Sequence, residues 1–355
     1  MIGWAAASAA PPSPPAAVPL SAAASSAPLT ANTALARLVR SPWSRDPFPT
    51  KDAIAEARRV LEAAAAREPA NTRWSFGLAH AVRLETAYET GDAAVAKRKE
   101  TKELFEKLVE REPGNAEYLY WLGDVCFDMI DDVGMLSKPS LASKGHAAFE
   151  KAVEIDPAYV AAHYALGTFY SQAPGIVGGS TAKAKSEGET LLKLPGGRGE
   201  FWGRILLAEI AAENKDWDEM SRQYTAAETA KGDGADAAIA LQAHVLRLLN
   251  EKKAPAAVLP LAARFRAAAK PGDSMADFAE GEARRQLGQW VEAAAAYEKV
   301  LAKNPEARNT RFGIAECYEK LGNRVEAKKH YEEFARRFPK DERASKARDS
   351  AKRLS

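Results

Sequence analysis

The stretch that decides the fold lies near the C-terminal end of the chain. Gly322–Phe334 reads GNRVEAKKHYEEF and is followed by Pro339. Earlier in the chain, Gly288–Val300 reads GQWVEAAAAYEKV and is followed by Pro305. Glycine, a glutamate–alanine pair, tyrosine and proline occupy the same positions in both stretches. This agreement indicates that the chain repeats one structural unit with a period of about 34 residues.

Prolines mark the ends of similar units along the rest of the chain. They are Pro69, Pro113, Pro157, Pro195, Pro271, Pro305 and Pro339. The units that end at Pro113 and Pro157 are longer than the last two, so they carry extra residues. The interval between Pro195 and Pro271 is long enough for two units, and Gly232 stands where the missing proline is expected. Since proline cannot continue a helix, each of these positions predicts the end of a helix.

The interior of the units carries a family resemblance. Leu122-Gly123 and Leu166-Gly167 supply a small residue in the first helix of their units, where two helices can approach closely. Together with the period and the prolines, these residues resemble the tetratricopeptide-repeat (TPR) family over about Lys51–Pro339. The resemblance implies an all-α fold, a right-handed α-solenoid of antiparallel helix pairs. One pair cannot bury its apolar face alone, so neighbouring pairs must stack.

A second resemblance concerns the middle of the chain. The combination of Tyr120–Gly123, Phe149–Pro157 and the loop Ala173–Ser180 is similar to exported bacterial repeat proteins of unassigned function. More weakly, it is similar to the T component of tripartite periplasmic (TRAP) transporters. This resemblance implies a location in the bacterial periplasm or outside the cell, and a cytoplasmic location is the alternative.

The N-terminal segment 1–30 has an unusual composition. It contains 11 alanines and 6 prolines and no charged side chain, and Ala7-Ser8-Ala9 matches a small-x-small cleavage site. We therefore expect either the remainder of a signal peptide or a disordered Ala/Pro-rich tail. Because no stretch of 18 apolar residues exists, we predict no membrane-spanning helix and no membrane insertion.

The rest of the chain divides into two predicted parts. Residues 31–339 are expected to form a solenoid of about seven to eight helix pairs, with longer loops near 85–100, 130–141 and 173–180. Residues 340–355 are expected to form a C-terminal capping helix. Within the solenoid, Pro255 suits a first helical turn, whereas Pro260 predicts a kinked or shortened helix.

The repeat register also predicts a ligand-binding groove. In the TPR family, positions 5 and 9 of each first helix face the concave groove, so the resemblance assigns them that role here. The predicted groove residues are Phe76, His80, Tyr120, Asp124, Tyr164, Thr168, Ile205, Glu209, Phe278, Glu282, Phe312 and Glu316. They would form a ladder of large apolar side chains and acids. The alternative is that some of the rings simply pack between helices.

The composition of this groove predicts its partner. Members of the family that hold a C-terminal carboxylate use lysine at position 5 and asparagine at position 9, and this chain has neither residue there. An apolar or basic protein or peptide segment is therefore expected to bind. The formal net charge of +2 gives no reason to expect nucleic acid. We predict a non-catalytic protein- or peptide-binding scaffold. The alternative is a small-molecule-binding or delivery subunit of a bacterial periplasmic transport system.

Catalytic and metal-binding motifs are weak in this sequence. The histidines form no H-E-x-x-H motif, and the two cysteines, Cys126 and Cys317, are read as small buried hydrophobes. Four acids, Asp124, Asp128, Asp131 and Asp132, follow one helical face, but they spread over about 10 Å of helix rise, too far for one ion. Ser180 is read as a helix N-cap rather than as part of a phosphate loop. We predict no enzyme, no cofactor and no metal site.

Overall fold

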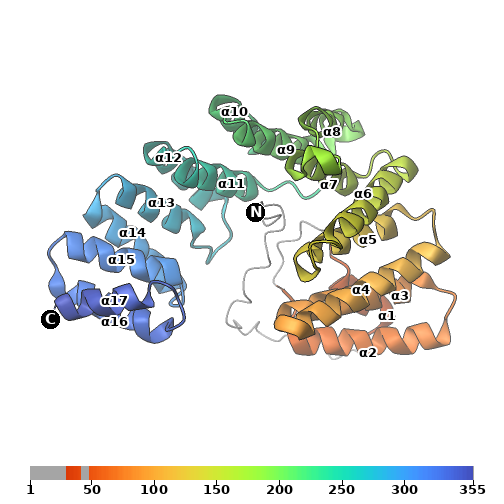
Figure 1. Cartoon of the computed structure of the whole chain (residues 1–355), viewed down its shortest axis with the longest axis horizontal. Helices are drawn as coiled ribbons and strands as arrows, with labels where there is room; N and C mark the ends of the chain where they lie inside the picture. The colour runs from red at the N-terminus through yellow and green to blue at the C-terminus, as the bar shows by residue number, and fades with distance from the viewer. Residues whose placement is uncertain (1–28, 41–47, 355) are drawn as a thin grey trace. The chain divides into compact units, whose positions relative to one another are not determined.

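The computed structural model describes residues 29–40 and 48–354, and the secondary structure in that part of the chain is entirely helical (Figure 1). Apart from its last two residues, the predicted N-terminal tail lies outside the described residues. The helices fall into two compact units, which are treated separately below. None of the described helices is long and apolar enough to span a membrane.

The first unit contains the described residues up to Leu206, together with 231–234. Its helices are α1 (Ala31–Leu38), α2 (Lys51–Arg67), α3 (Thr72–Glu85), α4 (Gly91–Arg111), α5 (Ala116–Asp128), α6 (Lys138–Ile155), α7 (Val160–Gln172), α8 (Thr181–Lys193) and the beginning of α9 (Glu200–Glu213). Short 3-10 turns lie at Thr86–Tyr88, Ile130–Asp132, Gly175–Val177 and Pro195–Gly197. From α1 to α8, each helix packs against its neighbours along the chain.

The second unit contains residues 207–230 and the residues from 235 onward. Besides the end of α9, it holds α10 (Trp217–Ala227), α11 (Ala237–Asn250), α12 (Pro255–Ala268), α13 (Met275–Gln286), α14 (Trp290–Lys303), α15 (Arg308–Lys320), α16 (Arg324–Arg337) and α17 (Ala344–Arg353). The last of these helices packs on α16 and buries Ala347 and Ala351.

The repeated prolines end helices, as their spacing predicts. Six helices stop two residues before a proline: α2, α4, α6, α8, α14 and α16, before Pro69, Pro113, Pro157, Pro195, Pro305 and Pro339. Helix α12 stops three residues before Pro271. The residue that precedes a proline is driven away from helical backbone angles, and this explains the regular distance.

Small residues allow neighbouring helices to approach closely. A Cβ atom on Gly123 would lie 2.5 Å from the ring of Phe149, and one on Gly167 would lie 2.2 Å from Leu206. In the second unit, Ala293 and Ala327 are fully buried. The predicted close approach of helices at Gly123 and Gly167 is therefore confirmed.

Two of the predicted longer loops are shorter than expected, and one helix is longer. The extra residues near 85–100 do not make a long loop, because α4 begins at Gly91 and runs for 21 residues, most of them good helix formers. Similarly, α6 begins at Lys138 and so takes up part of the expected 130–141 loop. Helix α12 continues past Pro260 to Ala268, so it is not shortened there, and a kink at Pro260 stays a prediction; Pro255 occupies its first turn, as expected.

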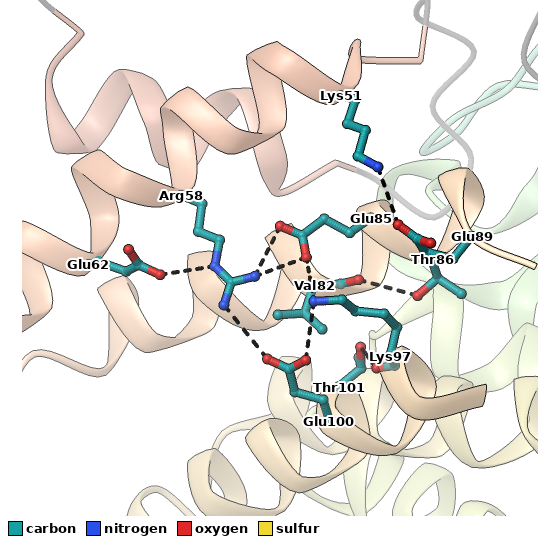
Figure 2. Close-up of polar contacts among 10 residues, drawn as sticks. All are labelled: Lys51, Arg58, Glu62, Val82, Glu85, Thr86, Glu89, Lys97, Glu100 and Thr101. Atoms are coloured by element: carbon teal, nitrogen blue, oxygen red, sulfur yellow. Dashed lines mark hydrogen bonds and ion pairs between the residues drawn. The ribbon is translucent and has the colours of Figure 1, made fainter. Parts of the chain in front are cut away.

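A network of ion pairs fixes α2, α3 and α4 relative to one another (Figure 2). Arg58 Nη1 donates to both carboxylate oxygens of Glu85, at 3.0 and 2.9 Å, and Lys97 Nζ lies 2.8 Å from Glu85 Oε2. Lys97 also reaches Glu100 at 3.3 Å. Burial opposes the charge on Glu85, but the hydrogen bonds from Lys97 and Arg58 lower its pKa. Three successive helices are thus joined through one carboxylate.

Candidate functional site

The predicted groove residues divide equally by burial. The buried ones are Phe76, His80, Tyr120, Thr168, Ile205 and Phe312, and the half-buried ones are Asp124, Tyr164, Glu209, Phe278, Glu282 and Glu316. At most 6% of Phe76, Tyr120 or Phe312 is exposed. These three rings therefore pack between helices, the alternative that the sequence left open. A contact between any of the twelve residues and a ligand stays a prediction.

His80 belongs to an aromatic cluster inside the first unit. Its ring lies edge-on to Phe76 and Trp121, with both centroid distances 4.6 Å, and to Phe105 at 5.6 Å. Burial, reinforced by the charge of nearby Arg83, lowers the pKa of His80 well below its usual value. The imidazole is accordingly neutral and acts as a packing residue between α3, α4 and α5.

Asp124, the acid that the sequence assigned to the groove in the first unit, forms an ion pair with a basic residue of the same chain. Arg83 from α3 lies 3.5 Å from Asp124 on α5, and its guanidinium lies over the Trp121 ring at 4.6 Å from the centroid. Burial and the neighbouring Asp128 raise the pKa of Asp124, and Arg83 opposes this effect. Asp124 is thus less available to a basic partner than the sequence suggested.

The acids of the second unit are paired in the same way. Arg285 on α13 binds Glu282 at 2.6 Å and lies 3.5 Å from Glu316 on α15. Lys346 also reaches Glu316, at 3.1 Å. Glu209 accepts hydrogen bonds from Arg247 and from the Tyr224 hydroxyl. Most of the acidic charge that the sequence assigned to the groove is compensated by neighbouring helices.

An open recess of about 710 Å³ lies in the first unit, where α1, α3 and the start of α5 meet. Its lining residues are Asn32, Leu35, Ala36, Val39, Arg73, Phe76, Asn115, Glu117 and Tyr118. Of the twelve predicted groove residues, this lining includes Phe76 alone. The sequence reasoning missed the contribution of α1, because the repeat register began at Lys51. The residue in the sequence that could have indicated the start of α1 is Thr30, whose side chain caps this helix by accepting a hydrogen bond from Thr33 N.

The recess combines an apolar wall with a charged rim. Leu35 and Val39 are half-buried and Ala36 is exposed, while the rings of Phe76 and Tyr118 are buried behind them. The ring of Tyr118 is held in place because its hydroxyl donates to Thr72 Oγ1 at 3.1 Å.

On the rim, Arg73 and Glu117 are exposed and carry opposite charges. The side-chain oxygen of Asn115 already caps α5, because it accepts hydrogen bonds from the backbone N–H groups of Glu117 and Tyr118. The recess therefore offers apolar contacts to a bound segment, and its polar rim offers groups that would orient that segment.

The remaining chemical candidates have structural roles. Ser180 caps α8 by accepting from Lys183 N at 3.3 Å, which confirms the N-cap interpretation. Cys126 and Cys317 are buried and free. His163 is buried and hydrogen-bonds Glu187 and the backbone carbonyl of Pro157. No group of three or more acidic, histidine or cysteine side chains among the described residues is placed to hold a metal ion.

The helix pairs, the small-residue contacts and the helix-ending prolines together define a tetratricopeptide-repeat protein, and residues 284–350 match the family model described as tetratricopeptide repeat. Residues 49–265, more than half of the chain, match the family model described as TRAP transporter T-component. The chain therefore belongs to the TRAP transporter T-component family.

Several known repeat proteins are similar to this chain. It is 28% identical to tetratricopeptide repeat protein 37 of Xenopus laevis over 228 residues, which are 64% of this chain but 14% of that protein. The crystal structure of yeast Tom70 shares the fold, with a TM-score of 0.62 at 15% identity, over 92% of this chain and 64% of that chain. A tetratricopeptide repeat protein from Parabacteroides merdae matches with a TM-score of 0.49 at 13% identity, over 75% of this chain and 93% of that chain.

Proposed function

We propose that this chain is a non-catalytic scaffold that holds a segment of a partner protein in the recess between α1, α3 and α5. The observation that carries the proposal is the recess itself, an open hollow with an apolar wall and a charged rim. An open hollow suits an extended peptide, whereas a small molecule is usually enclosed over most of its surface. Membership of a repeat family whose helices present extended surfaces supports the same function.

The recess is already formed before a partner arrives. Its α3 wall is tied to α2 and α4 through Glu85, and Tyr118 is fixed by Thr72. Little order is therefore lost on binding, and this favours affinity. An apolar side chain of the partner would lie against Leu35 and Val39. A basic residue beside it would pair with Glu117, so the recess favours an apolar segment with a neighbouring cation.

Filling the recess tests this proposal. Peptides that bind the wild-type chain would first be selected from a displayed random library. Their affinities for the wild-type chain and for the Ala36→Trp variant would then be measured by fluorescence anisotropy. The matched control is Ala96→Trp, at an exposed position of α4 that does not line the recess. We expect at least tenfold weaker binding for Ala36→Trp and unchanged binding for Ala96→Trp. Equal affinities for the two variants would contradict the proposal.

A second candidate is a small-molecule-binding or delivery subunit of a bacterial periplasmic transport system. Membership of the TRAP transporter T-component family favours it. The volume of the recess, about 710 Å³, also falls in the range of about 300–1,000 Å³ that is typical of small-molecule sites. Native mass spectrometry of the protein purified from its own organism distinguishes the candidates. A bound small molecule that Ala36→Trp excludes favours delivery over the scaffold.

Together with the transport role we propose a location in the periplasm, on the resemblance of the sequence to exported bacterial repeat proteins. Fractionation of the native organism tests it, with a cytoplasmic enzyme as the marker of lysis. Recovery of the chain with that marker would contradict the proposed location.

A further inference from the structure

Two residues of opposite charge stand at the same repeat position in successive helix pairs. Arg73 lies four residues after Pro69, and Glu117 lies four residues after Pro113. Both side chains are exposed, and both line the recess. The corresponding residues after the next four repeat prolines are uncharged: Ala161, Gly199, Met275 and Asn309. Charge at this position is therefore a feature of the two helix pairs whose first helices line the recess.

Neither of these charges is neutralised within the described part of the chain. Arg73 and Glu117 form no ion pair with each other or with any other described residue. The guanidinium of Arg73 lies 5.8 Å from the centroid of the neighbouring Trp74 ring. Arg343, which occupies the corresponding position before the capping helix, is different because it binds Asp341 at 2.9 Å. The two charges on the rim of the recess are therefore available to a partner.

Other charged groups close to this rim already have partners inside the chain. Arg111 Nη2 donates to the carbonyl oxygens of Pro69 and Ala70, at 2.8 and 3.1 Å. Glu112 accepts hydrogen bonds from the Thr72 hydroxyl and from the side-chain amide of Asn115. A single unpaired charge on a protein surface is ordinary. Two unpaired charges of opposite sign on one preformed hollow, however, can be matched by a complementary partner.

Helix α1 supplies the rest of what an extended segment needs. Leu35 and Val39 are half-buried and give the recess its apolar wall. Asn32, on the same helix, is exposed and lines the recess. Its side-chain amide forms no hydrogen bond with another described residue. Because an amide side chain both donates and accepts, Asn32 can pair with the backbone of a bound segment.

We propose that the recess recognises a protein segment in which an acidic and a basic residue stand on either side of an apolar residue. The acid pairs with Arg73 on α3, the base pairs with Glu117 on α5, and the apolar side chain lies on the α1 wall. A guanidinium suits a carboxylate because it can donate two parallel hydrogen bonds to it. The opposite order of charges would bring like charges together. This inference rests on the proposed scaffold function and adds the acid and the order of the two charges.

Exchanging the two charges of the rim tests this inference. The probes are a peptide selected from the displayed library and its counterpart in which the acid and the base are exchanged. Fluorescence anisotropy would measure both on the wild-type chain and on Arg73→Glu/Glu117→Arg. We expect the variant to bind the selected peptide at least about tenfold more weakly than the wild-type chain does, and the exchanged peptide more tightly. The matched control is Arg59→Glu/Glu103→Arg, since both residues are exposed, lie outside the recess and leave the net charge unchanged when exchanged.

The outcomes separate this inference from the scaffold proposal. If Ala36→Trp weakens binding but Arg73→Glu/Glu117→Arg binds both peptides as the wild-type chain does, the scaffold proposal stands and the charge pattern is wrong. Selected peptides that lack either charge beside the apolar residue would also overturn the pattern. If Ala36→Trp leaves every affinity unchanged, both proposals fail. Added salt should weaken binding of the selected peptide, and an affinity that salt does not change would contradict recognition by charge. Circular dichroism would show that each variant is folded.

Discussion

Buried His163 and half-buried Glu187 form a charged pair. Nδ1 of His163 lies 2.7 Å from Glu187 Oε2, and its Nε2 lies 3.0 Å from the carbonyl oxygen of Pro157. A carboxylate and a carbonyl only accept hydrogen bonds, so both ring nitrogens must donate and the imidazole is protonated. Burial opposes this charge, but the hydrogen bonds to Glu187 and Pro157 raise the pKa of His163. The cation links α7 to α8 and to the turn after α6.

This pair predicts a pH-dependent stability. A raised pKa in the folded state means that the contribution is fully present below the ordinary histidine pKa of about 6.5 and is lost as pH rises through the folded value. Substituting His163→Gln should therefore lower the melting temperature most below pH 6.5 and least above pH 8. Thermal melts of both proteins between pH 5.5 and 9 check this. Parallel curves for the two proteins would contradict the assignment of a charged His163.

The carboxylate of Glu85 should matter more than that of Glu62, although both bind Arg58. The Glu85 side chain is 17% exposed and also binds Lys97, whereas Glu62 is 51% exposed. We expect Glu85→Gln to cost about 1–3 kcal/mol, because two cations lose a partly buried partner. Glu62→Gln should cost less than about 0.5 kcal/mol. Urea unfolding at pH 7 measures both free energies.

The same carboxylate sets a second pH dependence, of opposite sign. Because the folded-state pKa of Glu85 is lowered, its contribution is present above the ordinary glutamate pKa and is lost as pH falls through the lowered value. The difference in stability between the wild-type chain and Glu85→Gln should therefore shrink toward pH 3. A difference that stays constant between pH 7 and pH 3 would show that the charge of Glu85 is not responsible.

Gly123 should not tolerate a methyl group. A Cβ atom there would meet the ring of Phe149 at 2.5 Å and the backbone oxygen of Gly145 at 3.0 Å. Gly123→Ala should cost about 1–3 kcal/mol through overpacking of α5 against α6. Gly114→Ala serves as the control, because nothing lies within 4 Å of its added Cβ. Chemical denaturation of the two variants compares them directly, and equal stabilities would refute the close-packing argument.

Ala327 gives the corresponding test in the second unit. It is fully buried in α16, so Ala327→Leu should overpack the helix contact and cost about 1–3 kcal/mol. Ala302→Leu, at an exposed position of α14, should change stability by less than about 0.5 kcal/mol. Differential scanning calorimetry would record both. A melting temperature that Ala327→Leu leaves unchanged would argue against the repeat register.

The sequence by itself determined the repeat and the ends of its helices. Proline limits the backbone of the residue before it, and glycine at Gly123 and Gly167 leaves room for a facing helix. These effects act within a few residues or recur at a fixed spacing, so they can be recognised from the sequence alone. The length of α4 was not predicted, because the repeat spacing shows that this unit has extra residues but does not show whether those residues are helical.

Only the tertiary structure decided what the groove positions do. Whether a ring at position 5 faces solvent or a neighbouring helix depends on side chains from the next helix pair, as with Phe76 and Tyr118, whose ring centroids are 4.9 Å apart. The partners of the acids, such as Arg83 for Asp124, come from adjacent helices in the same way. The recess needs α1, which lies outside the recognisable repeat. Much of the burial and many of the ion pairs arise where neighbouring repeats stack, so a single repeat does not show them.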